Sequence, residues 1–75
     1  MWRFVKTGTV GSCEMFGVNI FNLEWHNTQQ KVSVLDPTYG QQYDLTIYIV
    51  KIGDRENTFA AGEFSNNIYG FYVEE

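Results

Sequence analysis

The stretch YDLTIYIVKI, residues 43–52, is the strongest strand signal in the chain and decides its fold class. β-Branched and aromatic residues fill it, and these residue types favour extended backbone. Side chains alternate between the two faces of a strand, so both faces of this stretch are apolar. One face carries Tyr43, Leu45, Ile47 and Ile49, and the other carries Tyr48, Val50 and Ile52. A strand with one solvated side would carry polar residues there, so this strand needs cover on both faces.

The rest of the chain shows the same pattern of short apolar runs separated by turn residues. The predicted strands are residues 2–7, residues 9–15 after a bend, and residues 18–25, 31–35, 58–64 and 68–73. The predicted loops are residues 26–30, residues 36–40 with room for one 3₁₀ turn, and residues 53–57. Turn signals at intervals of about ten residues are typical of meanders, sandwiches and barrels.

Two positions leave alternatives open. Asp54 could cap a short helix that Gly62 would end, so residues 54–62 allow either a helix or a strand. A strand is preferred because Asn66 and Asn67 suit a two-residue hairpin turn directly after it. Gly70, inside the last predicted strand, indicates either a bulge or a closely packed neighbour.

Together these signals predict one small, mostly β domain over residues 1–75. We expect a small antiparallel meander, an open barrel or a sandwich-like sheet of about 5–7 strands, with room for one short helical turn.

A chain of 75 residues has a marginal core, since a domain of this size buries only about 60% of its unfolded surface. Cys13 is the one cysteine, so no internal disulfide can compensate, and its thiol suits a reducing compartment. We therefore expect a homodimer formed through an apolar sheet face, with room for another protein partner. A closed monomeric barrel is the alternative, because its interior would absorb one apolar face. The candidate interface residues are Tyr48, Val50, Ile52, Tyr69, Phe71 and Val73.

Charge and hydropathy limit the other partners. The formal net charge is −4, and the five Lys and Arg residues are scattered, which disfavours binding to nucleic-acid phosphates. No segment approaches the roughly 20 apolar residues of a membrane helix. The N-terminal residues lack the apolar core of a signal peptide. The sequence thus predicts a cytoplasmic protein that does not enter membranes.

Catalytic signals are weak. Cys13 and His26 are the one pair that could supply a nucleophile and a base, and no motif supports them. Glu24 and His26 share a strand face, but His26 opens a polar loop. One histidine and one cysteine are too few for a typical zinc site. We expect no enzyme activity, no metal and no cofactor.

Three functions remain, in order of preference. The first is a protein-interaction domain that self-associates through its apolar sheet face. The second is a module that binds a small ligand or a glycan by stacking it on exposed aromatic rings. Four residues could line such a face: Trp25, Tyr48, Tyr69 and Tyr72. The third is a barrel that binds single-stranded nucleic acid through the same rings.

Overall fold

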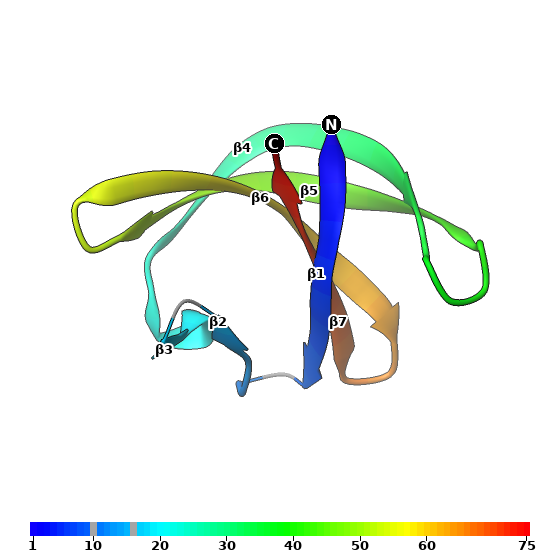
Figure 1. The fold of residues 1–75 in the computed structure, drawn as a ribbon, viewed down its shortest axis with the longest axis horizontal. Coiled ribbons are helices and arrows are strands. Elements are labelled where there is room, and N and C mark those ends of the chain that lie inside the picture. The colour runs from blue at the N-terminus through cyan, green and yellow to red at the C-terminus, as the bar shows by residue number, and fades with distance from the viewer. Residues whose placement is uncertain (10, 16) are drawn as a thin grey trace.

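The computed structural model describes residues 1–9, 11–15 and 17–75 and confirms a mostly β, antiparallel architecture. The strands are β1 (Trp2–Thr9), β2 (Glu14–Met15), β3 (Val18–Asn19), β4 (Trp25–Leu35), β5 (Gln42–Ile52), β6 (Arg55–Ser65) and β7 (Ile68–Glu74). Five of them form one sheet in the order β1-β7-β6-β5-β4, and β2 and β3 form a separate two-stranded sheet. The larger sheet curves into an arch, with β2 and β3 beneath one end of it (Figure 1). It stays open, with β1 and β4 at its edges.

Two tight hairpins build the centre of the sheet. β5 and β6 pair up to Ile52 and Arg55, so Gly53 and Asp54 form a two-residue turn. The prediction of a longer turn over residues 53–57 was wrong, because Gly53 at φ 62° reverses the chain directly. The strand preferred for residues 58–64 is confirmed within β6. The turn at Asn66 and Asn67 is also confirmed, with Asn67 at φ 63°.

β4 is one long edge strand, where a loop over residues 26–30 followed by a strand over residues 31–35 was predicted. Its pairing with β5 is interrupted between Asn27 and Lys31. Gln29 sits there at φ 62°, and the Thr28 hydroxyl donates a 2.7 Å hydrogen bond to the Ile47 carbonyl. The polar stretch is therefore an irregularity within a strand and not its end.

The prediction of a strand over residues 18–25 was also wrong. The chain leaves β3 for a 3₁₀ turn at Ile20–Asn22 and begins β4 at Trp25. The Asn19 side chain explains the break, because its Oδ1 accepts hydrogen bonds from the backbone N–H groups of Phe21 and Cys13 at 3.1 and 3.4 Å. An Asn that bonds nearby backbone in this way competes with the sheet ladder.

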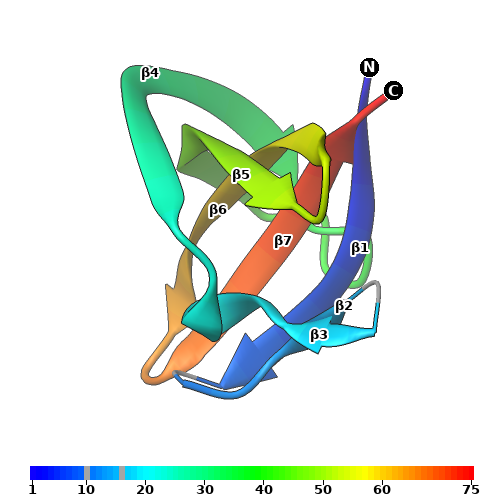
Figure 2. The ribbon, with the colours of Figure 1, turned by 90° about the vertical axis from the view of Figure 1, so that its left-hand side faces the viewer.

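Residues 11–15 and 17–23 together cover one face of the sheet, and we call them the covering segment. The strand predicted over residues 9–15 includes Val10, which lies outside the described residues. Of its described part, Thr9 ends β1 and Glu14–Met15 is strand. Figure 2 shows the covering segment lying across the lower ends of β1 and β7.

Two apolar clusters occupy the two faces of the sheet. Beneath the covering segment, Ile20, Val50 and Phe59 are fully buried. On the opposite face, Leu45, Ala60 and Tyr72 form a smaller cluster with Val34. Both apolar faces of β5 are therefore packed against other residues. The covering segment, which belongs to the same chain, provides the cover for one of these faces.

The loop after β4, over residues 36–40, contains no 3₁₀ turn, although the sequence left room for one. The Asp36 carboxylate accepts a 2.8 Å hydrogen bond from the Thr38 N–H, and the Asp36 carbonyl accepts one from the Gly40 N–H at 2.8 Å. Gly40 supplies the positive φ, 71°, that the turn requires. Among the described residues, no helix has the length and apolar character needed to cross a bilayer.

Candidate functional site

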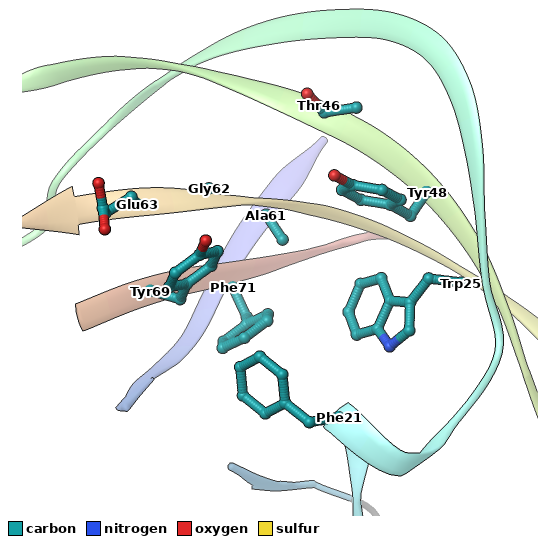
Figure 3. A pocket seen from close by; sticks show the side chains of 9 residues that line it. All are labelled: Phe21, Trp25, Thr46, Tyr48, Ala61, Gly62, Glu63, Tyr69 and Phe71. Carbon is teal, nitrogen blue, oxygen red and sulfur yellow. The ribbon is translucent and has the colours of Figure 1, made fainter. Parts of the chain in front are cut away.

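A pocket of about 360 Å³ opens between the covering segment and the concave face of the sheet. Its walls come from the 3₁₀ turn, the start of β4, and strands β5, β6 and β7 (Figure 3). The lining residues are Phe21, Trp25, Thr46, Tyr48, Ala61, Gly62, Glu63, Tyr69 and Phe71. Pockets that bind small molecules occupy about 300–1,000 Å³ and combine apolar walls with a few polar groups. This pocket lies at the lower end of that range and has that composition.

The aromatic walls meet nearly at right angles. The Trp25 and Tyr48 rings are 5.2 Å apart between centroids with an interplanar angle of 85°. On the other side, the Phe21 and Tyr69 rings are 6.2 Å apart at 82°. Figure 3 shows these four rings grouped around the pocket, with the Phe71 ring between Tyr69 and Trp25. Perpendicular rings are a favoured aromatic arrangement, so the walls support each other.

Trp25 is anchored at both its polar and its apolar edge. Its Nε1–H donates a 2.7 Å hydrogen bond to the carbonyl of Ile20, and its ring packs 5.7 Å from that of the buried Phe59. Ile20 is fully buried and holds the 3₁₀ turn on the sheet. The adjacent Phe21 is carried on the same turn, so this contact positions two of the walls.

The polar groups of the pocket are acidic or neutral. Glu63 is exposed and pairs with Tyr69 across β6 and β7. Within the described part of the chain, its carboxylate has no ion-pair or hydrogen-bond partner, and neither Tyr48 nor Tyr69 uses its hydroxyl in a hydrogen bond. The nearest cations by register are two exposed residues, Lys31 opposite Thr46 on β4 and Lys6 opposite Phe71 on β1, each two strands from β6.

The six predicted interface residues all belong to the cluster beneath the covering segment. Val50 and Phe71 are 0% and 1% exposed, so they are core residues of this chain. The other four, which are Tyr48, Ile52, Tyr69 and Val73, are half-buried. Three of the six line the pocket: Tyr48, Tyr69 and Phe71. Whether any of them forms an interface stays a prediction.

The structure brings together three of the four aromatic residues proposed for stacking. Trp25, Tyr48 and Tyr69 line the pocket, whereas Tyr72 is buried on the opposite face. Phe21 and Glu63 were missed. Phe21 was assigned to a strand that does not form, and nothing in the sequence marks Glu63 among nine acidic residues.

The candidate catalytic residues lie apart from this pocket. Cys13 is 3% exposed and packs so closely on β1 that a Cβ at Gly8 would lie 2.6 Å from its Cβ. Burial raises the pKa of the Cys13 thiol, and the Lys6 ammonium opposes that shift, so the thiolate is disfavoured. His26 is exposed on β4. Among the described residues, no three His, Cys, Asp or Glu side chains gather into a possible metal site.

A second cavity of about 690 Å³ lies on the other side of the sheet, between β1 and the loop after β4. Two of its lining rings, Tyr43 and Phe64, stack on each other with centroids 4.2 Å apart and an interplanar angle of 6°. Each ring thus has one face occupied by the other. Lys6 and Asp36 add opposite charges to the lining. The lining of this cavity therefore has no single charge preference.

Comparison with known proteins identified no relative of this chain. A scan against protein-family models, a search of curated proteins and a search of solved structures each found no match.

Proposed function

We propose that this chain is a non-enzymatic binding domain that holds a small ligand in its aromatic pocket. The observation that carries the proposal is the convergence of four rings, from the 3₁₀ turn, β4, β5 and β7, on one cavity. Core packing alone would turn these rings inward, as it does for Phe59 and Phe71. Phe21, Trp25, Tyr48 and Tyr69 are instead half-buried and border open space.

A binding role also fits the chemistry of the lining. Aromatic faces, two tyrosine hydroxyls and one carboxylate can orient a ligand. The two groups considered for nucleophilic chemistry, Cys13 and His26, are not among the lining residues. A cytoplasmic location is part of the same proposal and is supported by the unpaired thiol of Cys13.

Ligand titration tests this function. Trp2→Phe leaves Trp25 as the one tryptophan, so its fluorescence reports on the pocket. We expect at least one member of a panel of sugars, aromatic acids, organic cations and a short oligonucleotide to give a saturable shift. The shift should be accompanied by amide chemical-shift changes at Thr46, Gly62 and Tyr69. The Tyr48→Leu variant should lose both signals.

The opposite outcome is equally clear. If no panel member perturbs these amides at millimolar concentration while the protein stays folded, the pocket is packing space and the proposed function is wrong. Binding of the oligonucleotide alone would support the nucleic-acid alternative.

Self-association through a sheet face is a second candidate. Ile47 and Ile49 on β5 are half-buried, and among the described residues they are packed against neither core cluster. A domain with so small a core gains stability by covering such side chains with a second copy. This face of β5 is opposite to the one that the covering segment occupies.

Light scattering with a pair of substitutions tests it. A dimer at high micromolar concentration is expected to dissociate in Ile49→Lys. Ile52→Lys lies on the other face of the same strand and serves as the control. A monomer in the unmodified protein excludes this candidate, and dissociation by Ile52→Lys alone would move the interface to the face first predicted.

A further inference from the structure

We propose that the ligand of the aromatic pocket carries an N-methylated ammonium head group. This inference rests on the proposed function and names the chemical class of ligand for the same site. The argument uses the orientation of the rings, the charge of the lining and the size of the cavity.

The ring arrangement suits a cation with an apolar surface. The face of an aromatic ring carries negative charge density, and cations within about 6 Å of the ring centre are attracted to it. The Trp25–Tyr48 corner at 85° and the Phe21–Tyr69 corner at 82° place rings around the space from several directions. A flat aromatic ligand or a sugar would use one ring face, or two parallel ones. A roughly spherical head group can contact several perpendicular walls together.

The charge of the site has the complementary sign. Glu63 lines the pocket and is without an ion-pair partner among the described residues, and no Lys, Arg or His is part of the lining. The whole chain carries a net charge of −4. An anionic ligand would have to approach the carboxylate, whereas a cation gains from it. By register, Lys31 on β4 and Lys6 on β1 are the basic residues nearest to Glu63, each two strands from β6, and Lys6 donates a 3.0 Å hydrogen bond to the Glu14 carbonyl.

The size and hydration of the site favour methylated nitrogen over a simple ammonium. An unmodified ammonium is strongly hydrated, and this lining offers it one carboxylate. Methyl groups replace N–H donors with apolar surface, which ring walls can desolvate. The small side chain of Ala61 at the back of the pocket leaves the space, about 360 Å³, that such a head group needs.

The experiment compares two molecules of nearly the same shape. Choline and its uncharged carbon analogue 3,3-dimethyl-1-butanol are titrated into the Trp2→Phe protein, with Trp25 fluorescence and pocket amide shifts as readouts. We expect choline to bind at least about tenfold more tightly than the neutral analogue. Peptides with trimethyllysine or unmodified lysine form the second pair, and comparison with choline shows whether the head group belongs to a small molecule or to a protein.

Variants assign the effect to the pocket. Glu63→Gln should weaken choline several-fold and leave the neutral analogue unchanged. Glu56→Gln, the same charge change elsewhere on β6, should alter neither. Tyr48→Leu removes one ring wall and should abolish the preference for the cation.

The possible failures are distinguishable. If the neutral analogue binds as tightly as choline, or if sugars or aromatic acids bind and neither cation does, the head-group inference is wrong and the binding function stands. If no compound perturbs the pocket, both are wrong. Equal binding of choline to the native protein and to Glu63→Gln would remove the role of the carboxylate.

Discussion

The hydroxyl of Tyr72 donates a 2.6 Å hydrogen bond to the backbone carbonyl of Leu35. Tyr72 lies on β7 and Leu35 ends β4, and β6 and β5 separate these strands in the sheet. The bond therefore joins two strands that are not neighbours in the sheet, and it can form because the sheet is curved. It fixes the curvature that lets Val34, Leu45 and Ala60 pack with Tyr72.

Removing this hydroxyl should destabilise the fold without changing its packing volume. We expect Tyr72→Phe to lower the free energy of unfolding by about 1 kcal/mol, because the part-buried hydrogen bond to the Leu35 carbonyl is lost. Urea denaturation followed by circular dichroism measures the loss. Tyr39→Phe, at a residue that is 86% exposed, is the control and should change little. Equal stability of Tyr72→Phe and the native protein would show that the bond contributes nothing.

Alkaline pH should lower the free energy of unfolding of the native protein, because Tyr72 ionises. Burial raises the pKa of Tyr72 above its ordinary value of 10.0, with added contributions from Asp36 and Tyr43. The folded state therefore favours the neutral phenol of Tyr72. The stabilisation that this phenol gives the folded protein is fully present below pH 10. Stability falls as the pH rises from 10 through the higher pKa of the folded state, since the unfolded chain then loses its proton first. The stability difference between the native protein and Tyr72→Phe should shrink across that range, and a constant difference would contradict this.

Gly70 should tolerate no side chain. A Cβ at this position would lie 2.2 Å from the Phe64 ring, which covers it. We expect Gly70→Ala to cost about 1–3 kcal/mol, as overpacking usually does. In a Phe64→Ala background the same substitution should cost less, and a double-mutant cycle measures that coupling. Additive losses would mean that the ring does not cause the effect.

Asn19 should control the order of the covering segment. Besides the two N–H groups that bond its Oδ1, its Nδ2 donates a 3.2 Å hydrogen bond to the Gly11 carbonyl. We expect Asn19→Ala to lose about 1 kcal/mol and to increase hydrogen exchange in residues 11–23 more than in β5. The neighbouring exposed Asn22 offers a matched control, Asn22→Ala. Uniform exchange across the chain would show that the segment does not open separately.

The Cys13 thiol should be protected in the folded protein. Because it is buried and its pKa is raised, we expect it to react with a disulfide reagent at pH 8 at least about a hundredfold more slowly than in urea. Absorbance of the released thiolate measures both rates. Similar rates in the two conditions would mean that the covering segment opens readily.

The fold class could be predicted because strand signals are local. The alternation in residues 43–52 and the Asn66–Asn67 turn each depend on a few adjacent residues. The Gly70 signal was also local, and of the two alternatives the structure shows the packed neighbour, Phe64. The bulges of β1 and β6 lie elsewhere, between Phe4 and Lys6 and between Glu63 and Ser65.

The errors occurred where tertiary contacts override local preference. Residues 18–25 have strand composition, but Asn19 and the bond from Trp25 to Ile20 hold Ile20–Asn22 as a 3₁₀ turn over the core. The pocket depends on that turn, because Phe21 is one of its walls. Residue type alone was enough to predict Trp25, Tyr48 and Tyr69 as candidate binding residues. That they line one pocket together with Glu63 depends on the curvature of the sheet, which the sequence does not reveal.

The interruption within β4 has a consequence for how this protein behaves at high concentration. Long, flat edge strands recruit further strands and seed fibrils. Here Gln29 twists the backbone and the Thr28 hydroxyl bonds inward to Ile47, which divides the exposed edge into two short pieces. Neither piece offers the continuous template that growth of a cross-β filament needs, so we expect β4 to be a poor site for the addition of further strands.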